Sequence, residues 1–436
     1  MSRQKPIIGE TSRLHSLTRV VSVNACLRQL TSNVLKGVGA LVLKKSGQHE
    51  FRLSRTGFVL SIAFVLLSAC FARERGPRVE VVCPSPPIPV TIGKNKVLVY
   101  ELHLTNFDVV PLTLKRISIF SARENPDPLT TLEGEKLSAA MIRIGAPMVM
   151  SGGSSAGSGN TRTLDPGGRN VVFLWIELPA NKSAPTNLRH QLVFSSTPTG
   201  TDKPSDATLE DFSVAVDQNP VPVLSPPFDG GIWLVGDGPA NGSSHRRGIF
   251  AIDGHIYSPE RFAIDWVKIG PNGDSRHDEA SKNENWWGWR EPVLAVADGE
   301  ITEVVDEFPD NTPRVLPSVT LDNIAGNHIV LQIARSRFVT YAHLQRGSIK
   351  VRTGDHVHRG DMLALLGNSG NTTGAHLHLQ VTDHNSVLQS QGVPFVFAAF
   401  TYLGPGSDYP ENQVSEPWGN SIPPGDGVLK FEPVKK

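Results

Sequence analysis

Two histidines separated by one residue are the strongest chemical signal in the chain. They lie in the segment GAHLHLQV, residues 374–381. Side chains on a strand alternate between its faces, so we expect His376 and His378 to point to one side, with Leu377 and Leu379 in the core. Two imidazoles about 7 Å apart on one sheet face can ligate one ion and serve one reaction at it. Exposed strand residues would show the same spacing, so the pair alone leaves both interpretations open.

Further histidines lie upstream of this pair. Ten of the fourteen histidines of the chain fall between His245 and His384. His343 ends the predicted strand 338–344, and two Gly-Asp pairs and the turn-rich segment GNSGNTTG follow before the H-x-H pair. Histidine binds metals and titrates near neutral pH, so this clustering indicates a metal-dependent or acid–base site.

The elements that must position these side chains are predicted to be strands. Short apolar or alternating segments are separated by Pro- and Gly-rich turns, and no long stretch has a helical period. The predicted fold class is therefore mostly β, with an N-terminal β-sandwich-like domain followed by an antiparallel β-sheet domain. The predicted boundaries are 79–215 for the sandwich, 216–231 for a linker, 232–400 for the second domain and 401–436 for a Pro/Gly-rich tail.

The second domain resembles a known family over residues 291–381. Five sequence blocks carry the resemblance in order and spacing: PVLAVADG at 292–299, GNHIV at 326–330, YAHL at 341–344, the two Gly-Asp pairs at 354–355 and 360–361, and GNSGNTTGAHLHL at 367–379. They are similar to the motifs of the M23 zinc metallopeptidases, also called the LytM or lysostaphin-type domain. The segment FAIDW, which contains Asp265, extends the similarity upstream.

The resemblance implies a reaction and a role for each matching residue. It implies that Zn²⁺ is held by Asp265 and His378, and that His343 and His376 flank a water, help to activate it and stabilise the tetrahedral intermediate. It also implies peptide bonds of bacterial peptidoglycan as the substrate. A catalytic zinc ion needs three N or O ligands and one open position, and it lowers the pKa of bound water.

One position departs from the family pattern. The residue four before Asp265 should be a ligand histidine, but Arg261 stands there, and a guanidinium has no lone pair for a metal. Either His245 or His255 supplies the third ligand across a loop, or the site is degenerate and Arg261 forms a salt bridge with Asp265. In the second case the domain would bind peptidoglycan or regulate a cell-wall amidase without catalysis.

The N-terminal segment 1–69 is predicted to be an extension followed by a lipoprotein leader. Residues 58–69 form a twelve-residue apolar run preceded by Arg52 and Arg55, and Leu-Ser-Ala-Cys at its end resembles a lipobox with Cys70 as the lipidated residue. A short buried helix or an uncleaved anchor is the alternative. Residues 1–50 are unusually long for a leader, and they are either a misassigned start or a cytoplasmic extension.

Composition limits the partners. Lys+Arg and Asp+Glu are equal at 42 each, so the chain lacks the basic excess of nucleic-acid-binding proteins. Three cysteines exclude a disulfide-dense scaffold and a four-cysteine zinc module. The resemblance to the M23 family and the predicted leader imply a zinc metalloendopeptidase at the bacterial cell envelope, anchored to the membrane by lipid, whose partners are peptidoglycan peptides or an envelope protein.

Overall fold

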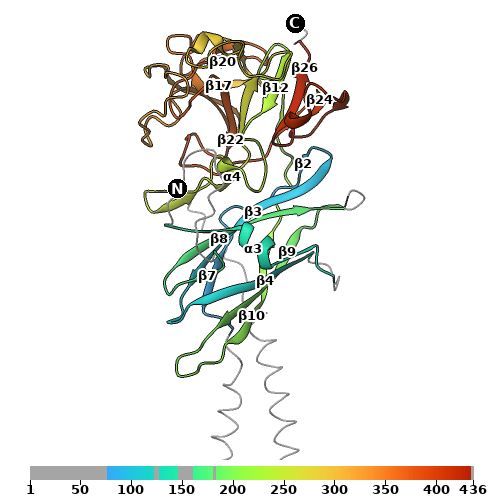
Figure 1. The fold of residues 1–436 in the computed structure, drawn as a ribbon, viewed down its shortest axis with the longest axis vertical. Coiled ribbons are helices and arrows are strands. Elements are labelled where there is room, and N and C mark those ends of the chain that lie inside the picture. The colour runs from blue at the N-terminus through green and yellow to red at the C-terminus, as the bar shows by residue number, and fades with distance from the viewer. Residues whose placement is uncertain (1–75, 122–126, 146–160, 180–182, 434–436) are drawn as a thin grey trace, which may run out of the picture. The chain divides into compact units, whose positions relative to one another are not determined.

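The computed structural model describes residues 76–121, 127–145, 161–179 and 183–433, and these residues form mainly antiparallel sheets (Figure 1). The predicted mostly β fold class is confirmed. Within the described residues, helices are limited to single short turns. These are α3 (Gly134–Ala139), α4 (Ser244–Arg247) and 3-10 turns at Asn283–Asn285 and Gly406–Asp408.

The first part of the described chain is a sandwich of two five-stranded sheets, coloured blue to green in Figure 1. One sheet contains β1 (Val79–Val82), β2 (Val90–Ile92), β3 (Asn95–Asn106), β6 (Met141–Arg143) and β8 (Arg169–Glu177). The other contains β4 (Leu112–Ser121), β5 (Thr130–Glu133), β7 (Thr163–Leu164), β9 (Asn187–Ser196) and β10 (Ser205–Ala215). Apolar side chains of both sheets, including Leu102, Leu114 and Phe194, form one buried cluster.

Strand β9 shows why the sequence forms this sandwich. Its buried positions alternate strictly with half-buried ones, as a strand with one face on a core requires. Strand β3 is different, because eight successive residues from Val97 to Leu104 are buried. A strand covered on both faces reads as a continuous apolar run, and the charged residue in this run, Glu101, is therefore unusual.

A ten-stranded sheet dominates the second part of the chain. Its strand order is β20-β17-β18-β19-β22-β15-β12-β26-β24-β25. In that order the bounds are His356–Val357, Gly299–Val305, Asn327–Ala334, Arg337–Leu344, Leu377–Thr382, Ile264–Lys268, Gly231–Val235, Gly427–Phe431, Phe400–Pro405 and Glu416–Trp418. Three two-stranded sheets accompany it: β11 (Val223–Leu224) with β23 (Val396–Phe397), β13 (Phe250–Ile252) with β14 (His255–Tyr257), and β16 (Pro292–Leu294) with β21 (Met362–Leu365).

The register of the central strands positions the candidate site. Asp265 of β15 pairs with His378 of β22, and His378 pairs on its other side with Ala342 of β19. The neighbouring residues Trp266, Leu377 and Tyr341 point to the opposite face and are fully buried. The alternation predicted around the H-x-H pair therefore holds, with apolar residues on one sheet face and the candidate site on the other.

Two segments differ from their predicted roles. The predicted linker 216–231 packs against the core: Leu224 and Phe228 are buried, and the Phe228 ring stacks on Trp233 with centroids 3.4 Å apart. The predicted tail 401–436 contributes β24, β25 and β26 to the ten-stranded sheet. Its Pro and Gly residues lie mainly in the turns between strands. They separate the short apolar segments that form the strands, so the sequence alone does not indicate a sheet here.

The apolar segment 293–305 is divided between two strands. Residues up to Leu294 belong to β16 and pair with β21, whereas β17 begins at Gly299 and pairs with β18. Gly299 allows this change of partner, because a Cβ there would lie 2.3 Å from the carbonyl oxygen of Gln332.

The leader 1–69 and the proposed lipidation residue Cys70 lie outside the described residues. No helix in the described ranges has the length and apolar character needed to cross a membrane. Cys83 is described and forms no disulfide, and burial raises the pKa of its thiol to about 11. This thiol is therefore unreactive near neutral pH.

Phe431→Ala tests whether the C-terminal segment is part of the core. The Phe431 ring is fully buried, with its centroid 5.3 Å from that of Trp266 and 5.7 Å from that of Phe397. Its loss should lower the free energy of unfolding by about 3–5 kcal/mol through lost burial and a residual cavity. Denaturant unfolding measures this, with the exposed Val414→Ala as control. Equal stability of the two variants would contradict the assignment.

Candidate metal centre

Three side chains from separate elements converge beside the central strands. His245 comes from α4, Asp265 from β15 and His378 from β22, and one ligand atom from each lies within 4.8 Å of the others. The group combines two imidazoles with one carboxylate. This is one of the donor sets that hold catalytic zinc while leaving a position open.

The donor atoms lie close enough together to share one small ion. His378 Nδ1 lies 3.0 Å from Asp265 Oδ1, and His245 Nε2 lies 3.6 Å from Asp265 Oδ2. Ligands held about 2.1 Å from a tetrahedral zinc ion lie about 3.4 Å from one another. The side chains of His245 and Asp265 are 13% and 20% exposed, so the centre is mostly buried but still reached by solvent.

Hydrogen bonds on the outer side of each ligand histidine fix which nitrogen faces the carboxylate. The Gln380 side-chain amide donates to the Val387 carbonyl, so its oxygen must accept from His378 Nε2, at 2.9 Å. His245 Nδ1 donates to the Asp237 carbonyl at 2.7 Å. Both rings therefore turn an unprotonated nitrogen toward Asp265 in their neutral form, as metal-ligating histidines do.

His376 and His343 are oriented in the same way. His376 Nδ1 donates to the Gly374 carbonyl at 2.9 Å, and His343 Nδ1 donates to the Ser369 carbonyl at 2.8 Å. The Nε2 atom of His376 lies 3.5 Å from Asp265 Oδ1. The ring centroids of His343 and His376 are 4.7 Å apart, and those of His343 and His378 are 5.8 Å apart. All four imidazoles thus belong to one cluster.

His343 holds its position with an uncommon backbone conformation. Its φ angle is +63°, a left-handed value that costs a non-glycine residue about 1–3 kcal/mol. Its N–H donates to the Ala325 carbonyl at 3.0 Å, and its carbonyl accepts from Gly367 at 3.1 Å. Non-glycine residues in such conformations concentrate at functional sites, where the surrounding structure enforces them.

A close approach of two loops supplies the partner of His343. Gly326 has φ +59°, and a Cβ on it would lie 2.4 Å from the Ser369 carbonyl group. Glycine is therefore required at this position for the loop carrying Ser369 to reach the end of β19. This explains chemically why a glycine, Gly326, directly precedes β18.

The carboxylate and the rings shift one another's protonation. Burial tends to raise the pKa of Asp265, but His245, His376 and His378 hold it well below its usual value. Burial tends to lower the pKa of His376 and His378, but Asp265 raises both. Burial lowers the pKa of His343, which the neighbouring histidines depress further. The cluster therefore favours a positive charge, on a protonated imidazole, beside the Asp265 carboxylate. The His343 ring, by contrast, favours its neutral form.

The structure places the two candidates for the missing ligand differently. His245 lies in the cluster, whereas His255 lies exposed in β14 beside Tyr257 and outside the cluster. The alternative salt bridge between Arg261 and Asp265 is not formed. Arg261 is buried and instead donates to the carboxylate of Glu101 from β3, with Nη2 2.9 Å from Oε2. The arginine at this position therefore leaves Asp265 free for the histidines.

Sequence reasoning missed two residues that hold the cluster together. Gln380 could have been found, because it lies two residues after His378 on the same strand face and is almost fully buried. Glu101 gave a weaker signal, a lone acid within the apolar run of β3. Nothing in the sequence linked it to Arg261, which lies 160 positions away.

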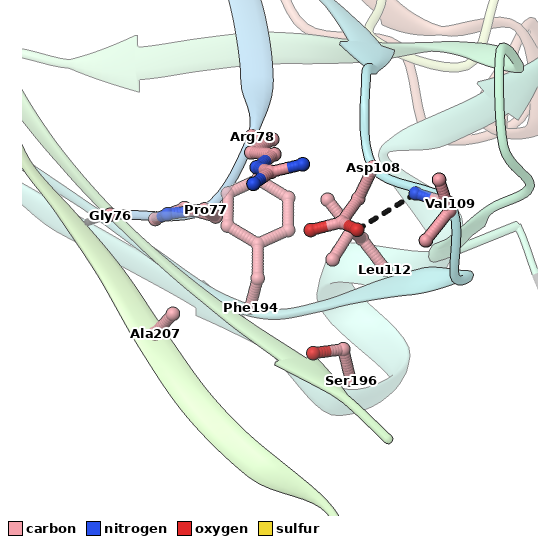
Figure 2. A pocket seen from close by; sticks show the side chains of 9 residues that line it. All are labelled: Gly76, Pro77, Arg78, Asp108, Val109, Leu112, Phe194, Ser196 and Ala207. Atoms are coloured by element: carbon pink, nitrogen blue, oxygen red, sulfur yellow. Dashed lines mark hydrogen bonds between the residues drawn. The ribbon is translucent and has the colours of Figure 1, made fainter. Parts of the chain in front are cut away.

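A concave region lies in the sandwich (Figure 2). Its volume is about 420 Å³, and its lining includes Arg78, Asp108, Phe194 and Ser196. None of the lining residues belongs to the histidine cluster, and none is a histidine that could activate Ser196. We therefore place the candidate site at the cluster and not at this pocket.

Comparisons with known proteins point to the same part of the chain. Residues 288–390 match the model of Peptidase family M23. An uncharacterized metalloprotease of Buchnera aphidicola is 31% identical over 102 residues, 23% of this chain and 23% of that protein. Peptidoglycan DD-endopeptidase ShyA of Vibrio cholerae is 40% identical over 57 residues, 13% of each. The chain thus spans less than a quarter of these curated relatives.

Among solved structures, the catalytic domain of the prophage-encoded M23 protein EnpA from Enterococcus faecalis is similar. The sequence identity is 19% and the TM-score 0.24, and the match covers 39% of this chain and 92% of that one.

Asp265→Asn should lower the pKa of both His376 and His378 in metal-free protein, because burial then acts without an opposing charge. NMR titration of the imidazoles with a chelator present measures this. The surface change Asp361→Asn should leave both pKa values unchanged. In the parent protein, the interaction of Asp265 with protonated His376 and His378 stabilises the fold below about pH 6.5. This contribution is lost as the pH rises through the folded-state pKa values of the two histidines. Unaltered titration of the two histidines in Asp265→Asn would refute the coupling.

Proposed function

Since residues 288–390 are a Peptidase family M23 domain, we propose that the chain is a zinc-dependent endopeptidase that cuts peptide cross-links of peptidoglycan. One observation carries the proposal. His245, His376 and His378 each commit one ring nitrogen to an outward hydrogen bond and turn the other toward a single carboxylate, that of Asp265. Lone pairs converging on a carboxylate repel one another unless a cation, either protons or a metal ion, lies among them.

The donor set fits zinc. His245 Nε2, an Asp265 carboxylate oxygen and His378 Nδ1 would hold the ion, with spacings close to those of a tetrahedral site. The hydrogen bonds to Asp237 and Gln380 provide the outer support that metal-ligating histidines usually have. When bound, zinc would supply a Lewis acid that polarises the scissile carbonyl and lowers the pKa of water.

His343 is suited to accept a proton. Its Nδ1 hydrogen is held by the Ser369 carbonyl, so Nε2 carries the lone pair, and burial favours the neutral ring. A neutral imidazole can take a proton from an attacking water at Nε2 and return it to the leaving amine. We assign His343 as the general base.

His376 is suited to stabilise developing negative charge. Its Nδ1 is fixed by the Gly374 carbonyl, its Nε2 faces the centre, and Asp265 favours its protonated form. A protonated ring can donate from Nε2 to the oxyanion of the tetrahedral intermediate. In the metal-free protein the two rings that flank the ligand group thus differ in charge preference.

The non-catalytic alternative has less support. A degenerate site that binds peptidoglycan or regulates a cell-wall amidase was suggested by Arg261 at the position of a ligand. In the structure Arg261 pairs with Glu101, and His245 completes a set of three donors. The donor set therefore favours catalysis.

The relatives support the substrate class and the location that we propose. ShyA is a peptidoglycan DD-endopeptidase, which favours peptidoglycan peptides as the substrate and the bacterial envelope as the location. We further propose that Cys70 is lipidated and holds the chain at a membrane. Its support is the sequence alone: an apolar run at 58–69 that ends in Leu-Ser-Ala-Cys.

His245→Ala should abolish stoichiometric zinc binding, whereas His255→Ala should retain it. Of these two histidines, only His245 places a nitrogen among the donor atoms. Metal analysis after equilibration with zinc and gel filtration measures the difference. Equal zinc content in the two variants would rule out His245 as the third ligand, and a parent protein without zinc at neutral pH would overturn the enzyme assignment.

His376→Ala should lower kcat on cross-linked peptidoglycan peptides by about 100- to 1,000-fold, the range for loss of one donor that stabilises the oxyanion. Zinc content should remain near that of the parent, because His376 is not among the three ligands. Cleavage is followed by chromatography of released peptides, with the exposed His358→Ala as a matched control. Parent-like turnover in His376→Ala would exclude the assigned role.

A further inference from the structure

A charged residue of the sandwich lies between the two segments that supply His245 and Asp265. Glu101 of β3 is fully buried, and its carboxylate forms ion pairs with both Arg246 and Arg261. These two arginines are 0% and 3% exposed. A carboxylate is almost never buried to this extent unless it is paired. The three residues therefore form one buried ion-pair network.

The first arginine belongs to the segment that carries His245. Arg246 is the next residue in α4, and besides Glu101 it binds the Tyr100 carbonyl through Nη2 at 2.8 Å. Arg247 donates to the Ala139 carbonyl, and both guanidinium groups lie over the Phe173 ring, at 4.9 and 5.4 Å from its centroid. The four-residue helix is therefore fixed to β3 and β8 of the sandwich.

The second arginine leads directly into the strand that carries Asp265. Arg261 donates to Glu101 through Nε and Nη2, to the Gly392 carbonyl through Nη1 at 2.8 Å, and to Gln391 Oε1 at 2.9 Å. Strand β15 begins three residues later at Ile264. The guanidinium fork thus fixes the start of β15 against both the sandwich and the segment after β22.

The geometry explains why one acid serves both segments. His245 sits on a single helical turn and lacks the ladder of hydrogen bonds that fixes Asp265 and His378 to each other. A ligand misplaced by about 1 Å weakens a metal site, so a short loop needs external support. Glu101 supplies that support to α4 through Arg246. Through Arg261 it also holds the start of β15, so both segments are fixed to the same carboxylate.

We propose that Glu101 is a positioning residue for the metal centre, so that the sandwich is a structural part of the peptidase site. This inference rests on the proposed zinc site. It assigns the sandwich a specific task, which is to set His245 relative to Asp265 by one carboxylate held between two guanidinium groups.

Glu101→Gln in the full chain tests the proposal. The amide has nearly the same shape but no charge, so both arginines lose their ionic partner. Zinc affinity, measured by competition with a chromogenic chelator well below the unfolding temperature, should fall about 10- to 100-fold, as for other residues that support metal ligands. The visible absorption of the Co²⁺-loaded protein should change shape, and excess zinc should recover peptide hydrolysis.

Glu80→Gln is the matched control. Glu80 is also a sandwich glutamate paired with an arginine, Arg169, at 3.6 Å, but on the solvent side. It should keep the parent's zinc affinity and Co²⁺ spectrum. Glu101→Asp retains the charge one methylene further back and should show intermediate affinity. It also serves as the deciding variant if Glu101→Gln does not fold.

The outcomes separate this inference from the proposed function. Parent-like zinc affinity in a folded Glu101 variant overturns the positioning role, even if the parent hydrolyses peptidoglycan. Weakened zinc binding in the Glu101 variants, with no hydrolysis by any protein including the parent, supports the positioning role and overturns the peptidase assignment.

Discussion

The candidate site depends on hydrogen bonds that hold the imidazole rings from outside. Carbonyl groups of Asp237, Gly374 and Ser369, and the side-chain oxygen of Gln380, each accept from one ring nitrogen. Carbonyl oxygens cannot donate, so the opposite nitrogen of each ring is left to face the centre. The chemistry at Asp265 is therefore determined by backbone geometry as much as by the residues that touch a substrate or an ion.

The sheet register and the loops contribute different parts of this arrangement. Pairing of β15 with β22 fixes Asp265 beside His378 through main-chain hydrogen bonds. His245 and His343 instead lie at a helical turn and at a strained strand end, where side chains and neighbouring loops determine the position. Two members of the cluster are thus rigid by topology, and the others depend on specific contacts.

Local sequence patterns predict one part of the site, and long-range pairing determines the rest. Alternation places His376 and His378 on one face, and motif spacing identifies Asp265 and His343. The choice between His245 and His255 requires the path of a loop, which periodicity does not encode. Likewise, the C-terminal strands β24, β25 and β26 are short and separated by Pro and Gly, so the pairing of β26 with β12 and of β24 with β26 is visible only in the folded chain.

The contact between Glu101 and the two arginines has a consequence for the order in which the candidate site forms. Residues of β3 are synthesised long before those of α4 and β15, yet the contact exists only when all three elements meet. A nascent or partly folded chain would therefore hold its imidazoles apart. The proposed zinc site would then arise only after the sandwich has folded against α4 and β15.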